Sequence, residues 1–350
     1  MKLSSLAAFV ASALAPMSAM AVNSVDLSTY QLVGRYALPS PPAGTTPANL
    51  LAQEASGVTW NRDTNTLFVV GDGGRAVTQV SLTGSLIDTM TLASGSSPQG
   101  TAFYDPEGIT YVGNNTFVMV EERYRVANRF TYTPNTTLSY SGAQQVKLGT
   151  TIGNVGLEGL SYDPKTGGFI FAKEISPMGV FQTTINFSAG TASNGSATTA
   201  NSVNLFNPSL IAGSVADLAD VFALSNVTAS GSTDYDNILL LSQESGKVIK
   251  VDRSGSILGT LNIPFLPSSG TPLTGAGGPL SLADQQHEGM TMDDLGNLYV
   301  VSENGGGNID NPQLWVFAPV PEPETYALML AGLALIGLRR RAKRSPEDLR

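Results

Sequence analysis

One pattern of strands and turns recurs five times along this chain and restricts the folds open to it. In each copy a short apolar strand is followed by a turn and a second strand, and an acidic residue ends that second strand. The copies align on Gly57, Gly108, Gly159, Asp220 and Gly289, which lie about 50 to 70 residues apart. This period is typical of β-propeller blades and is longer than that of most solenoid repeats.

Each copy except the last continues into two further strands. Third strands are predicted over residues 76–82, 125–133, 179–185, 247–253 and 313–319, and fourth strands over 85–92, 143–149, 201–206 and 256–263. The fifth copy lacks a fourth strand, whereas residues 30–39 show a strand pattern that belongs to no copy. That N-terminal strand would complete the last blade and leave no long unpaired edge. We therefore predict an all-β fold, a single β-propeller of five four-stranded blades closed by the N-terminal strand.

A six-bladed ring, a β-sandwich and an open β-solenoid are the alternatives. A sandwich or a solenoid tolerates repeated strands but gives no reason for a missing strand to reappear at the other terminus. The composition, with 37 Gly, 20 Pro and 13% charged residues in 350, agrees with short strands joined by turns. The small-residue stretches at 186–202 and 267–286 are expected to be loops.

The rare residue types exclude several kinds of chemistry. The chain has no cysteine, so disulfides, thiolate nucleophiles and cysteine-ligated zinc are excluded. Its single histidine, His287, excludes a histidine-rich metal site and disfavours a Ser–His triad.

The two ends of the chain are interpreted as targeting segments. Residues 1–21 combine Lys2, an apolar stretch and a small-residue cleavage site, as signal peptides do; a buried N-terminal helix is the alternative. The propeller is then expected over 22–319, followed by a sorting segment over 320–344 and a tail over 345–350. The sorting segment contains Pro321, Glu322 and Pro323, an apolar run from Tyr326 to Leu338, and a cluster of arginines.

This order of elements resembles the PEP-CTERM sorting signal. The resemblance implies processing by an exosortase, transient anchoring in the inner membrane, and delivery to the surface or extracellular matrix of a Gram-negative bacterium. The apolar run is shorter than the roughly 20 residues that span a bilayer comfortably. An ordinary single-helix anchor is the alternative. Contact with the membrane is expected only through this segment, before cleavage.

The body between these segments is strongly acidic. The chain has 19 basic and 28 acidic residues, of which 7 basic and 4 acidic residues lie outside residues 22–320. The body therefore keeps 12 basic and 24 acidic residues, a net charge of −12. Such a body repels nucleic acid and anionic membranes and attracts cations. We therefore expect no nucleic-acid partner.

The acidic residues recur at two positions of the repeat. In a propeller the innermost strand lines the channel and the next strand runs antiparallel to it, so the start of the first and the end of the second share one face. At the start stand Glu107, Glu158 and Glu288. Glu54, Asp105 and Asp217 stand two residues further back, in copies one, two and four. At the end stand Asp72, Glu121, Glu122, Glu174, Glu244 and Glu303. The repeat thus predicts an inner and an outer ring of carboxylates around one opening.

Carboxylates this close raise one another's pKa unless a cation compensates them. Ca²⁺ accepts six to eight oxygen ligands in flexible geometry, so the sequence favours Ca²⁺ as the cofactor if there is one. The expected ligands are Glu107, Glu158, Glu288, Glu54 and Asp217. In the alternative interpretation, each glutamate caps backbone N–H groups of the next blade. His287, beside Glu288 at the expected channel mouth, is a candidate general base; no other catalytic residue is indicated.

The repeats as written resemble those of the SdiA-regulated (YjiK-like) family of bacterial propellers. The resemblance rests on "EASGVTWNRDTNTLFVVGD", "DPEGITYVGNNTFVMVEER", "GLEGLSYDPKTGGFIFAKE" and "HEGMTMDDLGNLYVVSE" and is weak in the fourth copy. It implies an exported propeller with no established activity, for which a bound cation is an option. The "DPEG" and "LEG" elements also resemble, more loosely, the esterase-like phytase propellers.

Two functions from different classes follow. The first is a non-catalytic surface or matrix module whose acidic face holds Ca²⁺ or a partner such as an exopolysaccharide or a surface protein. The second is a metal-dependent hydrolase of a phosphoester, an ester or a lactone, in which the carboxylates hold a metal that activates water. An open coordination position would favour the second.

Overall fold

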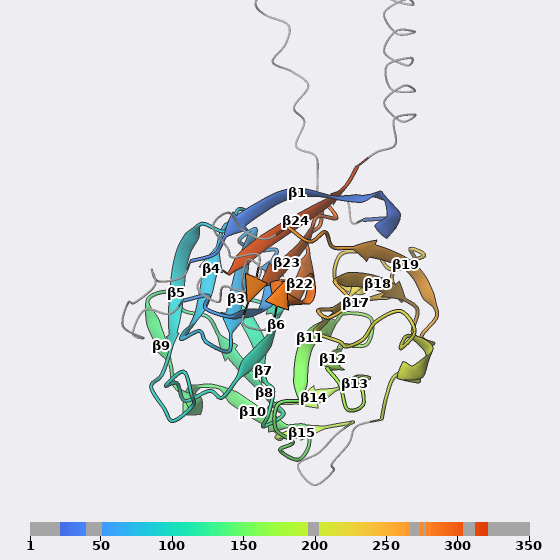
Figure 1. Cartoon of the computed structure of the whole chain (residues 1–350). Helices are drawn as coiled ribbons and strands as arrows, with labels where there is room; N and C mark the ends of the chain where they lie inside the picture. The colour runs from blue at the N-terminus through green and yellow to red at the C-terminus, as the bar shows by residue number, and fades with distance from the viewer. Residues whose placement is uncertain are drawn as a thin grey trace, which may run out of the picture.

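A computed structural model describes residues 22–39, 51–194, 203–266, 274–275, 278–279, 281–303 and 312–320. Figure 1 shows its sheets arranged around a common centre. The predicted signal peptide and the sorting residues Pro321, Glu322 and Pro323 lie outside the described residues. Within the described residues, no helix has the length and apolar character needed to cross a membrane.

Five antiparallel sheets form five blades, which confirms the predicted propeller. Blade one contains β2 (Ala55–Asn61), β3 (Thr66–Gly71), β4 (Ala76–Val80) and β5 (Leu86–Leu92). Blade two contains β6 (Pro106–Gly113), β7 (Thr116–Glu121), β8 (Val126–Thr131) and β10 (Gln144–Lys147). Blade three contains β11 (Leu157–Asp163), β12 (Gly168–Lys173) and β13 (Gly179–Thr183). Blade four contains β16 (Asp220–Ala223), β17 (Ile238–Ser242), β18 (Lys247–Val251) and β19 (Ile257–Asn262). Blade five contains β22 (His287–Met292), β23 (Leu298–Ser302), β24 (Gln313–Pro319) and the N-terminal β1 (Tyr30–Ala37).

The N-terminal strand closes the ring as predicted. Strand β1 pairs antiparallel with β24, from Tyr30 opposite Pro319 to Ala37 opposite Gln313 (Figure 1). The inner strands pack in a closed cycle, β2 on β6, β6 on β11, β11 on β16, β16 on β22 and β22 on β2. The two ends of the folded chain therefore share one blade, and its outer edge is formed by β1.

Blade three departs from the predicted four strands. Residues 201–206 were expected as its outer strand, and the described part of this stretch forms no strand. Leu205 donates a single backbone hydrogen bond to the carbonyl of Val180 at 2.6 Å, and the Asn204 side chain accepts from the Val180 N–H at 3.0 Å. Because a side chain occupies the place of a partner carbonyl, the ladder does not continue.

Short strands appear in three places where none was expected. Strand β9 (Thr136–Leu138) adds to blade one, in parallel with β5. Two small hairpins, β14 (Ile185–Asn186) with β15 (Thr191–Ala192) and β20 (Thr274–Gly275) with β21 (Gly278–Pro279), lie in or beside the two stretches expected as loops. They extend the rim and the loops without changing the number of blades.

The hydrophobic core consists of five clusters, one between each pair of neighbouring blades. Between blades one and two, for example, the rings of Phe68 and Phe117 lie 4.5 Å apart, and Tyr132 packs edge-on against Phe68 at 4.8 Å. The strands of a propeller are apolar on both faces because each sheet is covered on both sides, which explains the near-continuous burial of β2, β3 and β17.

A ladder of hydroxyl groups joins neighbouring inner strands. Two residues after the aligned glycine, Thr59, Thr110, Ser161 and Thr291 each accept a backbone N–H from the neighbouring blade. The donors are Tyr111 (3.0 Å), Tyr162 (2.9 Å), Ala223 (3.0 Å) and Trp60 (3.1 Å), respectively. Each hydroxyl satisfies a buried donor that no strand pairing reaches, so this position of the repeat holds the ring together.

Blade four replaces this contact with a carboxylate. Its equivalent position is Phe222, which has no hydroxyl group. Instead, Asp220 at the glycine position accepts N–H groups from Leu160 of blade three at 3.2 Å and from Met290 of blade five at 2.7 Å. The substitution that made the fourth copy look degenerate is therefore a structural link across three blades.

The aligned glycines allow the backbones of neighbouring blades to meet. A Cβ atom on Gly57 would lie 2.4 Å from the carbonyl oxygen of Glu107, and one on Gly289 would lie 2.5 Å from that of Ser56. Because these neighbours are backbone atoms, a side chain at either position would push two blades apart.

Candidate functional site, the central acidic cavity

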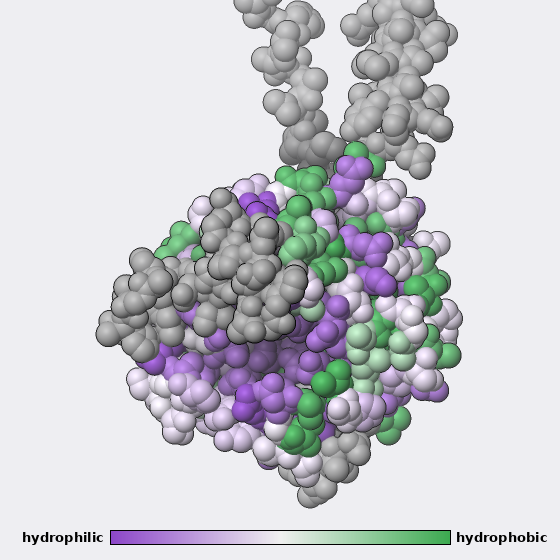
Figure 2. All heavy atoms as spheres, in the orientation of Figure 1, coloured by the Kyte–Doolittle hydropathy of each residue, from purple (hydrophilic) through white to green (hydrophobic). Residues whose placement is uncertain are grey.

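A cavity of about 240 Å³ opens where the inner strands begin. Figure 2 shows hydrophilic residues gathered in a hollow near the centre of this face. Its described lining is polar except for Ala219: Asp72, Glu107, Glu122, Asn154, Glu158, Glu174, Gln243, Gln286, Glu288 and Glu303. Seven of these residues are carboxylic acids, and none of the described lining residues is basic.

Bulges at the start of the inner strands direct the inner glutamates. The register shifts between Pro106 and Gly108 in blade two, between Leu157 and Leu160 in blade three, and between His287 and Gly289 in blade five. The residues in these shifts include Glu107, Glu158 and Glu288. An unpaired residue at a bulge can turn its side chain out of the alternating pattern, here toward the channel.

Only three blades supply an inner glutamate. Blade one has the same bulge but carries Ser56 in it, and blade four begins its strand at Asp220 without a register shift. At the equivalent position blade four presents Ala219 to the cavity. The inner ring predicted from the repeat is therefore a set of three glutamates from blades two, three and five.

Four of the six predicted outer acids reach the cavity, namely Asp72, Glu122, Glu174 and Glu303. Glu121 instead accepts from the Tyr104 N–H at 2.9 Å and from the Asn128 amide at 2.8 Å within blade two. Glu244 is exposed and is not among the described lining residues. Adjacent residues at the end of a strand point in opposite directions, so Glu122 lines the cavity while Glu121 is buried inside the blade.

Two of the expected metal ligands lie outside the lining. Asp217 is fully buried, where it accepts from the Ser242 hydroxyl and from the Glu244 N–H at 3.1 Å. Glu54 is partly exposed beside the turn at Gly73 and is not among the described lining residues, although its charge acts on Asp72 and Glu303. Asp217 thus acts as a turn-stabilising group, and Glu54 contributes to the site through its charge.

Burial and mutual repulsion raise the pKa values of the lining acids. Burial raises the pKa of Glu107, Glu158 and Glu288 well above the ordinary glutamate value, with neighbouring carboxylates adding to the rise. The same causes raise the pKa of Asp72 to about 8, and burial raises those of Glu122 and Glu303 to about 7. The cavity therefore retains protons at neutral pH when no cation is bound.

Four of these acids form two hydrogen-bonded pairs across the rings. Glu158 bonds to Glu122, and Glu288 bonds to Glu303, each joining an inner to an outer residue. A hydrogen bond between two carboxyl groups requires a proton on one of them. These protons occupy oxygens that a metal ion would otherwise use.

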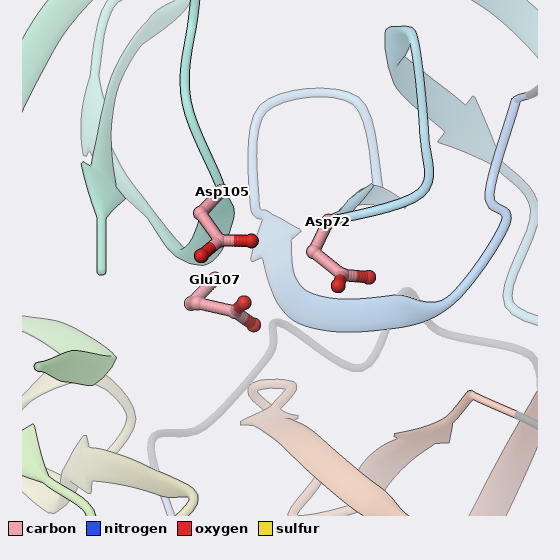
Figure 3. Close-up of side chains that lie close together, drawn as sticks. All are labelled: Asp72, Asp105 and Glu107. Carbon is pink, nitrogen blue, oxygen red and sulfur yellow. The ribbon is translucent and has the colours of Figure 1, made fainter. Parts of the chain in front are cut away.

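A further group of three acids has its carboxylate oxygens close together, and one of them, Asp105, also hydrogen-bonds to Glu122. Asp72, Asp105 and Glu107 each offer one oxygen, and these atoms lie within 4.8 Å of one another (Figure 3). Asp105 was noted in the repeat but was not among the expected ligands. Arg123 forms an ion pair with Asp105 and lies 3.6 Å from Glu122, so it orients one side of the group.

The inner glutamates do not cap the neighbouring blades. Within the described part of the chain, no backbone N–H donates to Glu107, Glu158 or Glu288, because the hydroxyl ladder and Asp220 take those donors. A capping contact is made instead by outer Glu122, which accepts from the Gly156 N–H at 3.0 Å. The inner three are left facing the cavity.

His287 lies elsewhere than the sequence suggested. We expected it at the channel mouth, but its side chain is fully buried and packs edge-on against Trp315 at 4.8 Å. Burial lowers its pKa to about 3, so the imidazole is neutral at physiological pH. His287 and Glu288 are adjacent in β22, and successive side chains of a strand point to opposite sides. The His287 side chain therefore points into the blade, whereas that of Glu288 points into the channel.

Comparison with known protein families gives one match for the propeller body and one for the C-terminal segment. A model of the SdiA-regulated family matches residues 44–305, and a model of the PEP-CTERM protein-sorting motif matches residues 319–344. Both confirm the resemblances found in the repeats and in the C-terminal segment. The sorting motif implies export, processing by exosortase-type machinery, and transient anchoring in the membrane.

Solved structures with a similar chain path have very different sequences. They include a glutaminyl cyclase from Myxococcus xanthus, with 11% identity, 83% of this chain and 95% of that chain covered, and a TM-score of 0.45. A luciferin-regenerating enzyme has 11% identity, coverage of 83% and 94%, and a TM-score of 0.44. A gluconolactonase from Xanthomonas campestris has 12% identity, coverage of 82% and 99%, and a TM-score of 0.41. At such identities the likeness concerns the fold alone.

Proposed function

Because this chain belongs to the SdiA-regulated family and carries a PEP-CTERM motif, we propose that it is an exported Ca²⁺-binding propeller. Its place of action is the cell surface or the extracellular matrix, and its exposed faces hold a partner there. The observation that carries this proposal is the central cavity, where seven acids face one another and no described lining residue is basic.

The physical argument is one of compensation. Seven carboxylates around a cavity of about 240 Å³ repel one another strongly. Burial and this repulsion raise their pKa values, so some of them hold protons when no cation is present. A divalent cation supplies the missing positive charge and replaces several of the protons. The side-chain oxygens of Asn154, Gln243 and Gln286 add neutral donors to the lining.

The donor set suits Ca²⁺ better than Mg²⁺. The acids come from blades one, two, three and five, some from the start of an inner strand and others from the end of the strand paired with it, so they follow no single repeat position around the ring. Ca²⁺ accepts six to eight such oxygens in flexible geometry, whereas Mg²⁺ demands near-ideal octahedral geometry and gives up water reluctantly. The group Asp72, Asp105 and Glu107 is the best-formed starting point for its ligands.

Calorimetric titration of CaCl₂ into the EDTA-treated mature chain tests this proposal. We expect saturable binding that is weakened at least tenfold in Glu107→Gln and Glu158→Gln. Glu244→Gln is the matched control, because Glu244 is exposed and outside the described lining. Absence of heat, together with an unchanged melting temperature in EDTA and in Ca²⁺, would refute cation binding.

Metal-dependent hydrolysis of an ester, lactone or phosphoester is the second candidate. The observation that favours it is a set of lining acids, Asp72, Glu122 and Glu303, with pKa values of about 7 to 8. Acids that titrate near neutral pH are suited to general acid–base catalysis. A nitrophenyl ester, a nitrophenyl phosphate and a simple lactone are the substrates to try with Ca²⁺ present. Turnover that is lost in Glu122→Gln would establish this function, and no turnover would leave the binding role.

A further inference from the structure

A second hollow, of about 330 Å³, lies at the opposite ends of the inner strands. It is formed by the last residues of β6 and β11 and by residues that follow β2, β6, β11 and β16, whereas the acidic cavity lies where the inner strands begin. The side chains that matter here are Arg62, Asp63, Tyr111, Asn114, Tyr162 and Asn226. We call this set the distal pocket.

The middle of the channel separates the distal pocket from the acidic cavity. The hydroxyl groups of Thr59 and Thr110 bond across neighbouring strands there, and the buried side chain of Phe222 from blade four lies at the same level. The space that these residues line at this level is about 20 Å³. A ligand in the distal pocket therefore makes no contact with the acids, and the two sites are testable independently.

Two tyrosine rings in the pocket are held in place by the blades. Tyr111 packs against Phe117 with ring centroids 5.2 Å apart, and its hydroxyl donates to the carboxylate of Asp63. Tyr162 packs edge-on against Phe169 at 5.6 Å. Because these rings are fixed before a ligand arrives, stacking on them carries little entropic cost.

Planar polar groups surround the rings. The Arg62 guanidinium donates to the carbonyl of Asn226 at 2.6 Å and lies over the Trp60 ring, 6.0 Å from its centroid. The Asn226 amide donates in turn to the carbonyl of Tyr162 at 2.7 Å. Asn114 is exposed at the rim, and its side chain makes no hydrogen bond to the described residues. The Arg62 guanidinium has five N–H donors, and the bond to Asn226 uses only some of them, so the others face solvent.

The charges in the distal pocket cancel, in contrast to the acidic cavity. Its lining contains one cation, Arg62, and one anion, Asp63, among the described residues. An anionic or a cationic ligand thus gains no net attraction there. A neutral ligand with an apolar face and many hydroxyl groups matches the rings and the planar polar groups at once.

We propose that the distal pocket binds one neutral sugar residue, either free or at the end of a glycan. The C–H face of the sugar lies on Tyr162. Its hydroxyl groups bond to Arg62, to the free oxygen of Asp63 and to the Asn114 amide. The position opposite the acidic cavity leaves room for the propeller to hold a glycan on one face and a cation on the other.

Saturation-transfer NMR with the methyl glycosides of glucose, galactose, mannose and N-acetylglucosamine tests this inference. The mature chain is used in EDTA, so that occupation of the acidic cavity plays no part. We expect transfer to at least one glycoside at about 10 mM, since single sugars bind weakly. Tyr162→Ala and Arg62→Gln should weaken that binding at least fivefold, and a matching trisaccharide that binds more tightly would indicate a glycan end rather than a free sugar.

Two matched variants serve as controls. Tyr124→Ala removes a tyrosine that is 40% exposed near the acidic face, and Glu158→Gln alters the acidic cavity; neither should change the transfer. Arg62 is an exposed turn residue, so Arg62→Gln is expected to fold even if Tyr162→Ala does not. The proposal is overturned by the absence of transfer to all four glycosides, or by transfer that Arg62→Gln leaves unchanged.

Discussion

The link made by Asp220 provides the sharpest test of how this ring is held together. One carboxylate oxygen accepts from the N–H groups of Leu160 at 3.2 Å and Val221 at 2.7 Å, and the other accepts from that of Met290 at 2.7 Å. The substitution Asp220→Asn keeps the size of the side chain but replaces one oxygen with an NH₂ group. In either orientation of the amide, a donor then faces a backbone donor in a buried place.

The expected cost follows from that mismatch. If the amide oxygen keeps the two bonds to Leu160 and Val221, the Met290 N–H loses its acceptor. A buried donor left unsatisfied costs about 1–3 kcal/mol, and loss of a charged partner places the value toward the upper end. We therefore expect unfolding to be easier by about 2–3 kcal/mol. For a domain of this size the melting temperature should fall by roughly 3–5 °C.

Urea and thermal unfolding followed by tryptophan fluorescence measure this change, since Trp315 lies in the core between blades four and five. Asp236→Asn is the control, because Asp236 is 60% exposed and pairs only with Lys165 at the surface. If Asp220→Asn unfolds at the same urea concentration as the parent chain, the three hydrogen bonds do not hold the blades together and the reasoning fails.

Three further predictions follow from the same structure. In EDTA the melting temperature should fall as the pH rises from about 4 to about 8. Asp72, Glu122 and Glu303 have a higher pKa in the folded chain than in the unfolded chain, so the stability they contribute is complete below the unfolded pKa and is lost as the pH rises to the folded pKa. Ca²⁺ should remove most of this decline, and a flat profile in EDTA would contradict the prediction. Thr110→Val should cost about 1–3 kcal/mol in urea unfolding by depriving the Tyr162 N–H of its acceptor, whereas Thr137→Val, at an exposed site of β9, should be neutral. Deletion of residues 22–37 should expose the edge of β24 and cause association visible in size-exclusion chromatography, and a stable monomer would show that β1 is dispensable.

The fold was predictable because its main signal is periodic. Strand, turn and glycine recur in each blade, and the orphan strand at residues 30–39 identified the closure at β1 and β24. The missing outer strand of blade three was not predictable, because it depends on one contact between Asn204 and Val180. Period-two alternation gives the same strand pattern whether or not a partner carbonyl is present.

The site was predictable only in part because side-chain direction depends on local register. The repeat located Glu107, Glu158 and Glu288, but the bulges that turn them toward the channel are visible only in the pairing of the strands. Asp217, two residues further back in the repeat, was also expected to reach the cavity, yet Ser242 and the Glu244 N–H occupy its oxygens. His287 and Glu288 are likewise neighbours in β22, yet His287 is buried in the blade and Glu288 lines the cavity.

Blade four shows why the ring of acids is incomplete. In blades two, three and five the bulge, the glutamate and the following glycine act together, since the glycine lets the next backbone approach while the glutamate turns inward. Blade four has no bulge at this point, and Asp220 uses its carboxylate to bridge its neighbours. Ala219 thus leaves the blade-four side of the described lining without a carboxylate of its own.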